Sequence, residues 1–394
     1  MRDKITPDGT KDIVLEEYNR YLAVKETLMN LFRMQGYEGV MTPTLEYYDV
    51  FAKSTRDLQL DLMYKLMDEK GRLLVLCPDC TIPVARLLAT RFKDREKPLR
   101  LFYHHNIYQM DPEKRGKPIE MSQMGVELIG GNQWKSDYEI VELAATCIQE
   151  IVGETFQLEL CHIGYFKAIM DSMKVEDEIK EEIHRFIEQK NYAALANILE
   201  PYKEEKAAKA LLQLPRLFGG MEVIEKAYTL FDENGAKESL DYLKQVYQYT
   251  KSFCSEKQVI VDLGLVNQAD YYTGIIFRGY VSGVGEPVLS GGRYDQLLGK
   301  FGEDSKAIGF GMNVDLASKV ICYEERKVKE VLVFTEEERY AIKSLKYQKE
   351  LRKQGIVAIP SVFERIEEVV SYAKKRNIRE IHIVGEEIQS REVE

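Results

Sequence analysis

The sequence predicts an α+β fold: an antiparallel sheet with flanking helices, a helical insertion and a small C-terminal α/β domain. Strand-like runs with short connections fill much of the first part of the chain, and short connections favour antiparallel pairing. A charged stretch of helical pattern follows over about 171–252, after which strand signals return. The end of the chain alternates strands with helices, which predicts a parallel sheet. We therefore expect a core domain over 1–325 and a second domain over 326–394.

The first predicted element is a helix over residues 15–35. Apolar side chains recur there at three- and four-residue spacing, as on one face of an amphipathic helix. Gly36 stands where a glycine commonly ends a helix, because glycine adopts a positive φ without strain. The next run, YEGVMTPTLEYYDVF, predicts a strand that Pro43 interrupts.

Further apolar runs predict more strands of the same sheet. They are RLLVLCP (72–78), LRLFYHHNIYQM (99–110) and EMSQMGVELIG (120–130). A helix is expected next, with Ser136 as its N-cap and an apolar face that includes Ile140, Leu143 and Cys147. Beyond the helical insertion, the runs QVIVDLG, YYTGIIFRGYV and EPVLSGG predict that the sheet resumes.

The C-terminal domain is predicted from the order of its elements. EVLVF, IVAI and EIHIVG are strand-like, and a helical pattern separates each from the next. A βαβαβ order of this kind forms a small parallel sheet covered by its helices.

Composition and charge exclude several classes of protein. A chain of 394 residues with 45% hydrophobic residues can bury a large core. Its net charge of -10 argues against a protein held mainly by polyanions, since such proteins carry a basic face. No apolar run approaches the roughly 18 residues of a membrane helix, and the first residues contain no signal-like apolar segment. We expect a cytoplasmic protein that does not bind membranes.

The six cysteines are scattered along the chain, unlike those of a secreted disulfide scaffold. Cys77 and Cys80 form a CPDC motif, which is compatible with zinc binding or redox chemistry. A zinc site would need a second pair of ligands at finger-like spacing, and only Cys161 and His162, far away in sequence, offer one. We expect neither a metal nor a cofactor.

The stretch DYYTGIIF places Tyr271 and Tyr272 before a glycine and an apolar run. It predicts a strand entering a tight turn, because aromatic and β-branched residues suit a sheet and Gly274 permits a positive φ. Neighbouring strand residues point to opposite faces, so both tyrosines can line one pocket only where the strand is twisted or bulged. A strand does not explain the acidic Asp270 beside them.

Four ordered segments resemble the catalytic core of histidyl-tRNA synthetases, which have a class II aminoacyl-tRNA synthetase fold. They are TPDGTKDI with GYEGVMTPTLEYYDVF; PDCTIPVARL; MDPEKRGKPIEMSQMGVELIG; and DYYTGIIF with LSGGRYDQLLGKFG and AIGFGM. The resemblance covers about residues 5–317 outside the helical insertion, and several motifs in order are more specific than any one of them.

The resemblance implies a pocket for free histidine. The residues at the family's histidine-binding positions are Asp79, Thr81, Gln123, Glu127, Tyr271 and Tyr272. Histidine carries an ammonium group that favours a carboxylate, and an imidazole with one donor and one acceptor. We expect Glu127 and the tyrosine pair to frame the imidazole, and the other three to meet the ammonium. Asp79 is a methylene shorter than the family's glutamate, so its contact could be water-mediated. Alone, Gln123 and Glu127 also fit outward-facing residues of an ordinary strand.

The arginines with which a synthetase activates histidine by ATP are missing at three places. Charge that develops on the α-phosphate must be met by preorganised cations. At the family's arginine positions this chain has Tyr108, Asn267 and Leu316. Losing one such donor costs about 10²–10³ in rate, so losing all three should abolish adenylation. The loop residues Lys114, Arg115 and Lys117 offer only a partial substitute.

A histidine pocket without activation chemistry resembles the regulatory subunits of ATP phosphoribosyltransferase. The resemblance implies a non-catalytic chain, with no catalytic residue of its own, which binds the short catalytic phosphoribosyltransferase subunit. That complex would perform the first step of histidine biosynthesis under feedback by histidine. The alternatives are an active histidyl-tRNA synthetase or related amino-acid ligase, and a free-standing histidine sensor.

The same resemblance bears on assembly. The segment around Pro43 resembles the class II motif that packs across a two-fold axis, which implies a homodimer. The C-terminal domain resembles only the first two-thirds of a synthetase's anticodon-binding domain, so we expect no tRNA recognition.

Overall fold

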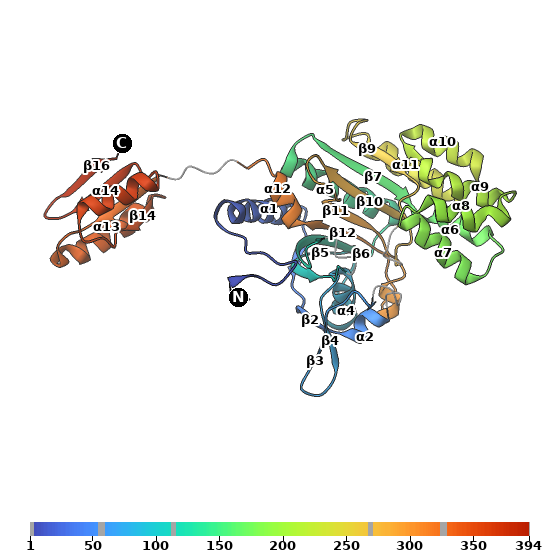
Figure 1. Ribbon diagram of the computed structural model, residues 1–394, viewed down its shortest axis with the longest axis horizontal. Coiled ribbons are helices and arrows are strands. Elements are labelled where there is room, and N and C mark those ends of the chain that lie inside the picture. The colour runs from blue at the N-terminus through green and yellow to red at the C-terminus, as the bar shows by residue number, and fades with distance from the viewer. Residues whose placement is uncertain (1–3, 54–59, 112–115, 267–270, 324–328, 394) are drawn as a thin grey trace. The chain divides into compact units, whose positions relative to one another are not determined.

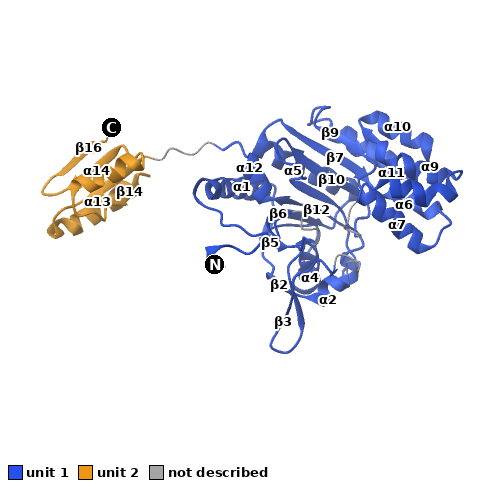
Figure 2. Cartoon of the chain, viewed as in Figure 1, with its two compact units in different colours: residues 1–323 blue, residues 324–394 orange. Residues whose placement is uncertain are grey.

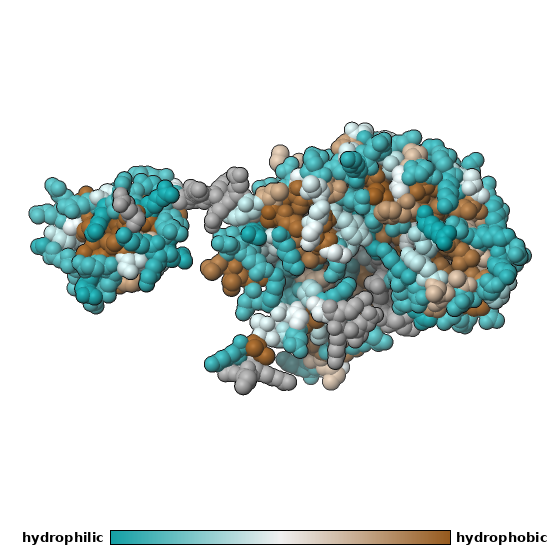
Figure 3. All heavy atoms as spheres, turned by 45° about the horizontal axis from the view of Figure 1, so that its top comes forward, coloured by the Kyte–Doolittle hydropathy of each residue, from teal (hydrophilic) through white to brown (hydrophobic). Residues whose placement is uncertain are grey.

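The computed structural model describes residues 4–53, 60–111, 116–266, 271–323 and 329–393. The chain divides into two compact units, Met1–Tyr323 and Glu324–Glu394 (Figure 2). Hydrophilic residues cover most of the visible surface of each unit, with apolar patches between them (Figure 3). None of the helices described is long and apolar enough to cross a membrane.

In its described part, unit 1 is built on a nine-stranded, mostly antiparallel sheet (Figure 1). In sheet order the strands are β1 Glu38–Val40, β5 Leu99–Tyr108, β6 Glu120–Ile129, β12 Ala307–Asn313, β11 Leu289–Arg293, β10 Ile275–Val281, β7 Phe156–His162, β9 Val259–Asp262 and β8 Phe218–Gly219. β1 pairs with β5, and β7 with β9, in the parallel sense. The predicted α+β class and antiparallel sheet are confirmed.

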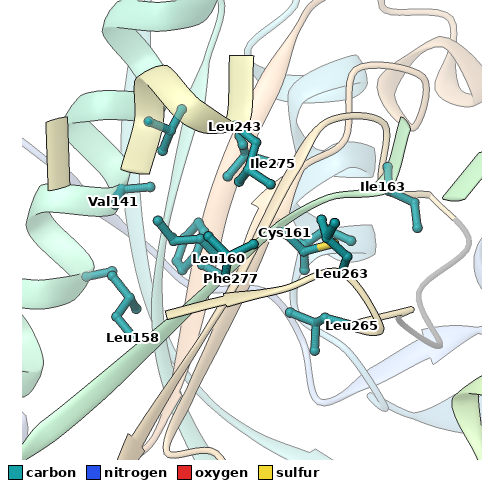
Figure 4. Packing of buried hydrophobic residues seen from close by; sticks show 14 of the residues in the cluster. Val141, Leu158, Leu160, Cys161, Ile163, Leu243, Leu263, Leu265, Ile275 and Phe277 are labelled. Atoms are coloured by element: carbon teal, nitrogen blue, oxygen red, sulfur yellow. The ribbon is translucent and has the colours of Figure 1, made fainter. Parts of the chain in front are cut away.

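One face of this sheet is covered by helices. They are α1 Leu15–Met34, α5 Gln133–Val152 and α12 Val314–Val320. Apolar residues of the helices and the sheet form one buried cluster. Figure 4 shows part of it, with Leu160 and Phe277 of the sheet near Val141 of α5 and Leu243 of a later helix, α11 (Ala236–Thr250).

The start of α5 differs from the prediction. The helix begins at Gln133 with Asn132 as its N-cap, so Ser136 is not the cap. Asn132 has extended backbone angles (φ -76°, ψ 138°), and its carbonyl accepts the backbone N–H of Ser136 at 3.0 Å. Ser136 is buried inside the first turn.

A group of helices lies beside strands β7 and β9 (Figure 1). It consists of α6 Ile163–Ser172, α7 Asp177–Glu188, α8 Tyr192–Leu199, α9 Lys206–Gln213, α10 Met221–Leu230 and α11. The short strand β8 interrupts the group and pairs with β9. The buried residues of these helices belong to the same cluster as those of the sheet, so this segment shares its core with the sheet.

The opposite face of the sheet carries a second layer. It contains α2 Tyr48–Ala52, α4 Thr81–Arg91 and a three-stranded sheet of β2 Leu45–Tyr47, β4 Leu73–Leu76 and β3 Lys65–Met67. The prediction of one strand across Pro43 is wrong in two respects. β1 and β2, on either side of the proline, belong to different sheets, and the chain is helical from Tyr48.

A buried ion pair ties the sheet to α5. Arg293, at the end of β11, is 2% exposed, and its Nε donates to Asp137 Oδ1 at 2.8 Å. The hydroxyl of Tyr242 on α11 donates to the other oxygen of Asp137, and Arg293 Nη1 donates to Asp295 Oδ1 at 2.8 Å. The backbone N–H of Thr273 donates to the carbonyl of Arg293 at 2.7 Å. The network therefore anchors the chain just after Tyr271 and Tyr272.

Unit 2 has the predicted βαβαβ order. It consists of β13 Glu330–Phe334, α13 Ala341–Lys353, β14 Val357–Pro360, α14 Ile366–Lys375, β15 Glu380–Val384 and β16 Ile388–Glu392. β13 pairs in parallel with β14 and β15, whereas β16 is an antiparallel edge strand that the sequence analysis missed.

We expect Arg293→Met to destabilise unit 1 by about 3–5 kcal/mol, because it leaves the Asp137 carboxylate buried without its cation. Urea unfolding followed by fluorescence measures this change in unit 1, since the single tryptophan, Trp134, lies at the start of α5. The control is Arg185→Met, which removes an exposed partner of Glu182 and should cost about 0–1 kcal/mol. Equal effects of the two changes would contradict the role given to the buried pair.

Candidate functional site

A cavity of about 280 Å³ lies between the second face of the sheet, the N-terminus of α4 and the segment before β10. This volume lies just below the range of about 300–1,000 Å³ that is typical of ligand pockets, so the cavity suits a small ligand. The structure brings all the predicted pocket residues into its wall. They are Asp79, Thr81, Gln123, Glu127, Tyr271 and Tyr272. Asn267 and Asp270, which the sequence analysis also singled out, lie outside the described residues.

Gln123 and Glu127 reach the cavity because they lie on one face of β6. On the neighbouring strand β12, Gly309 lies directly opposite Glu127, and Gly311 follows two residues later on the same face. A Cβ at Gly309 would come within 1.9 Å of Glu127 Oε2, and one at Gly311 within 2.6 Å of Gln123 Nε2. The glycines therefore make the space that these two side chains occupy.

Glu127 is 1% exposed, and both of its oxygens accept hydrogen bonds. Thr81 Oγ1 donates to Oε1 at 3.0 Å, and the hydroxyl of Tyr294 donates to Oε2. Burial, together with the neighbouring Asp79 carboxylate, raises the pKa of Glu127 to about 8, although the two hydrogen bonds oppose the shift. A cation bound beside Glu127 would favour its ionised form.

Asp79 lies just before α4 and points both to the helix and into the cavity. Its Oδ1 accepts the backbone N–H of Ile82 at 3.0 Å, and its Oδ2 accepts the hydroxyl of Tyr271 at 3.3 Å. Burial raises the pKa of Asp79, whereas these hydrogen bonds lower it. The cavity therefore contains two carboxyl groups whose charged forms are only partly stabilised by their hydrogen bonds.

Tyr271 and Tyr272 line the cavity together because they precede β10 and do not belong to it. Their ring centroids are 5.0 Å apart. The prediction of a strand that includes Tyr271 and Tyr272 is wrong. Strand β10 begins only at Ile275, and Thr273 before it donates its backbone N–H to the carbonyl of Arg293. Successive strand residues point to opposite faces of a sheet, but Tyr271 and Tyr272 lie outside the strand, so both side chains can line the cavity.

The sequence analysis missed two tyrosines of the cavity wall. Tyr294 holds Glu127 as described above, and the hydroxyl of Tyr103, on β5, donates to Gln123 Oε1 at 3.3 Å. Tyr294 directly follows the SGGR run that ends β11, and this aromatic residue within a glycine-rich motif was the available signal. Tyr103 is one of several aromatic residues in an apolar strand, which hides its role.

The wall of the cavity contains no lysine or arginine among the described residues. A cationic ligand with several hydrogen-bonding groups suits such a site, since carboxylates and tyrosine hydroxyls surround it. A triphosphate does not suit it, because its negative charge would face Asp79 and Glu127.

The positions that carry activating arginines in synthetases have other contacts here. The hydroxyl of Tyr108 donates to Glu120 at 2.8 Å, and Leu316 packs against the core. Lys117 lies 3.5 Å from Glu286, and Lys114 and Arg115 lie outside the described residues. Cys77 and Cys80, the pair of the CPDC motif, are free and buried.

Comparison with known proteins gives consistent results over most of the chain. The family model for histidyl-tRNA synthetase matches residues 9–316. An ATP phosphoribosyltransferase regulatory subunit from Clostridium novyi is 37% identical over 96% of this chain and 91% of that protein. A crystal structure of an ATP phosphoribosyltransferase regulatory subunit/histidyl-tRNA synthetase from Bacillus halodurans has a TM-score of 0.83 at 30% identity, covering 94% of this chain and 96% of that one. A histidyl-tRNA synthetase from a Nostoc species, at 18% identity, shares the fold with a TM-score of 0.78, covering 99% of this chain and 97% of that one.

The raised pKa of Glu127 predicts how stability changes with pH. Its folded-state pKa of about 8 lies above the ordinary 4.5, so the folded chain binds this proton more firmly than the unfolded chain. The stabilisation is complete below pH 4.5 and is lost as the pH rises through 8. We expect the free energy of unfolding of the wild type to fall, relative to Glu127→Gln, between about pH 5 and pH 8.

Urea unfolding at several pH values, in buffers without histidine or imidazole, measures this difference. Glu238→Gln, which changes an exposed carboxyl on α11, is the matched control for removing one acidic group. A difference between wild type and Glu127→Gln that stays constant or changes in the opposite direction would contradict the assignment.

Proposed function

The chain belongs to the family of ATP phosphoribosyltransferase regulatory subunits, which share the histidyl-tRNA synthetase fold, and we propose that it binds free histidine and supports a separate catalytic chain. One observation carries the histidine part of this proposal. Asp79 and Glu127 line the same small cavity, and the described residues of its wall include no lysine or arginine. A ligand with an ammonium group and a donor-bearing ring supplies what both carboxyl groups lack.

The positions of the two acids suggest how histidine would lie. Glu127 already accepts hydrogen bonds from Thr81 and Tyr294, and a carboxylate has lone pairs left for an imidazole N–H. Asp79 accepts from Tyr271 at 3.3 Å, a long contact that leaves this oxygen available to an ammonium. Glu127 with the tyrosine pair would then frame the ring, while Asp79, Thr81 and Gln123 would meet the amino group.

The chain would not activate the histidine that it binds. Tyr108 and Leu316 occupy two arginine positions of the synthetases, and their contacts with Glu120 and with the core do not provide a phosphate site. Losing such a donor typically costs about 3–4 kcal/mol of transition-state stabilisation. The chain is accordingly proposed to have no catalytic residue, and phosphoribosyl transfer would take place on the partner.

Histidine bound here would regulate the partner's reaction. Feedback of this kind is a coupling free energy between two sites, so the ligand must favour one state of the complex over another. The partner we propose is the short catalytic chain of ATP phosphoribosyltransferase, in keeping with the names of the relatives. The complex would then adjust the first step of histidine biosynthesis to the supply of histidine.

A homodimer is proposed through the second layer of unit 1. Exposed apolar side chains gather on and next to the three-stranded sheet: Met41 is 84% exposed, Leu45 47% and Met67 75%. Apolar groups clustered in this way mark interaction surfaces, and the adjoining Pro43 segment resembles the class II dimer motif.

Glu127→Gln should weaken histidine binding by about 1.5–3 kcal/mol, because it removes a charge-assisted contact. Isothermal titration of histidine into the isolated chain measures the loss, and Glu238→Gln is the control for removing a distant acidic group. If the wild type does not bind histidine at millimolar concentration, the proposal that histidine is the ligand is wrong.

Mixing the chain with the catalytic phosphoribosyltransferase chain should give a hetero-oligomer with activity that neither chain has alone. Size-exclusion chromatography followed by an assay of the mixture measures both properties. The Glu127→Gln complex should keep its activity and lose inhibition by histidine. Separate elution with a catalytic chain that is fully active unaided would overturn the proposed partnership.

The isolated chain should show no histidine-dependent exchange between ATP and pyrophosphate, and clear exchange would favour the amino-acid ligase instead.

The isolated chain should sediment as a dimer at micromolar concentration. Met67→Glu places a charge in the proposed interface and should shift the chain toward monomer. Ile342→Glu, at a 70% exposed position in unit 2, is the control and should leave the dimer intact. A monomeric wild type would refute this interface.

A further inference from the structure

The aromatic wall of the cavity comes from two separate segments of the chain. Tyr271 and Tyr272 lie in the segment before β10, and Tyr294 lies in the turn after β11. The rings of Tyr271 and Tyr294 meet edge to face, with centroids 5.9 Å apart. All three tyrosines lie beyond the ends of the paired strands, so contacts outside the β10–β11 ladder must hold the two segments together.

Thr273 is bonded to both sequence neighbours of Tyr294. Its backbone N–H donates to the carbonyl of Arg293 at 2.7 Å, and its hydroxyl oxygen accepts the backbone N–H of Asp295 at 3.0 Å. The same hydroxyl donates to the carbonyl of Arg293 at 3.4 Å. Tyr294 therefore lies between two residues that Thr273 holds, and Thr273 itself directly follows Tyr272.

Other hydrogen bonds hold each segment separately. Lys167 Nζ on α6 donates to the carbonyl of Tyr272 at 2.8 Å. The backbone N–H of Tyr294 donates to the carbonyl of Ala307 on β12 at 2.8 Å. These bonds tie the first segment to a helix and the second to the sheet, whereas those of Thr273 tie the two segments to each other.

We propose that Thr273 is a positioning residue of the cavity, whose hydroxyl holds the turn that carries Tyr294 and so keeps the Tyr294 hydroxyl bonded to Glu127. The inference deepens the proposed function and rests on it. Thr273 is not among the described residues of the cavity wall, so it would act on the ligand through Tyr294 and Glu127.

The position of Tyr294 matters because an ionised Glu127 binds an ammonium or an imidazole N–H more strongly than a neutral one. Burial raises the pKa of Glu127 to about 8, and the hydrogen bond from Tyr294 is the strongest of the contacts that lower it. If that hydrogen bond weakens, the pKa rises further, and less of Glu127 is ionised at neutral pH. Losing the Thr273 hydroxyl should therefore weaken binding most where Glu127 is only partly ionised.

The other titratable groups that face Glu127 come from around α4, from β5, from the segment before β10 and from the turn after β11. They are Asp79, Cys80, Tyr103, Tyr271, Tyr272 and Tyr294. Burial raises the pKa of the thiol and of each phenol, so these groups stay neutral up to pH 9. Burial also raises the pKa of Asp79, but its hydrogen bonds with Tyr271 and with the backbone of Ile82 do not involve the turn that carries Tyr294.

The test measures histidine binding to the full chain by calorimetry at pH 7 and at pH 9. Thr273→Val nearly keeps the shape of the side chain and removes its hydroxyl. It should weaken binding roughly 3- to 10-fold at pH 7, the range expected for ordering one side chain on binding. The loss should shrink at pH 9, where more Glu127 is ionised in both proteins. Titration of histidine itself is common to both proteins and cancels in the ratio of their affinities.

Three further variants separate positioning from a general effect. Thr273→Ser keeps the hydroxyl and should bind histidine as the wild type does. Thr146→Val removes a hydroxyl that donates to Glu142 on α5, and it should leave binding unchanged at both pH values. Tyr294→Phe removes the hydroxyl that Thr273 is proposed to position, so its loss of affinity should also shrink at pH 9.

Urea unfolding shows whether each variant is folded. If Thr273→Val does not fold, Thr273→Ala removes the same hydroxyl and decides. Failure of both variants to fold would show that the contact supports unit 1 as a whole, and it would overturn the positioning role.

The inference is also overturned if Thr273→Val binds histidine like the wild type, if its loss is equal at the two pH values, or if Thr273→Ser is as weak as Thr273→Val. Each of these results leaves the histidine site standing. Absence of histidine binding by the wild type would instead remove the proposed function, and this inference with it.

Discussion

Burying Asp79 and Glu127 in one small cavity costs free energy, because each carboxylate loses water and the two negative charges repel each other. Hydrogen bonds from Thr81, Tyr271 and Tyr294 offset only part of this cost, since the pKa of both acids stays raised. A stable core has no need of such a pair. The buried acidic pair is explained if a cationic ligand binds between the two acids and neutralises their charge. Histidine, with its ammonium group, is such a ligand.

The surrounding fold supplies the space and rigidity that this arrangement needs. The glycines of β12 leave room for Gln123 and Glu127, because a side chain at either position would collide with them. On the opposite side, the backbone carbonyl of the buried Arg293 accepts the backbone N–H of Thr273 and fixes the chain after the tyrosine pair. The ligand would therefore enter a site whose acidic and aromatic walls are already in place, and little ordering would be lost on binding.

Much of the fold could be predicted from local patterns. The periodicity of α1, the apolar runs of β5 and β6, and the alternating order of unit 2 each identify an element by short-range chemistry. Patterns failed where long-range pairing decides the structure. Pro43 separates two strands that join different sheets, and β16 becomes a strand only because β15 offers it an edge in an otherwise polar sequence.

The candidate site shows the same division. Its six predicted residues came from ordered motifs, and no periodicity would have selected Asp79 or Gln123. Tyr294 was missed because its contact with Glu127 depends on strand register, which a single sequence does not reveal. The most direct test of the account is a crystal structure of the chain grown with saturating histidine. The account predicts histidine in the cavity, with an imidazole nitrogen within hydrogen-bonding distance of Glu127. An empty cavity, or histidine bound elsewhere on the chain, would contradict it.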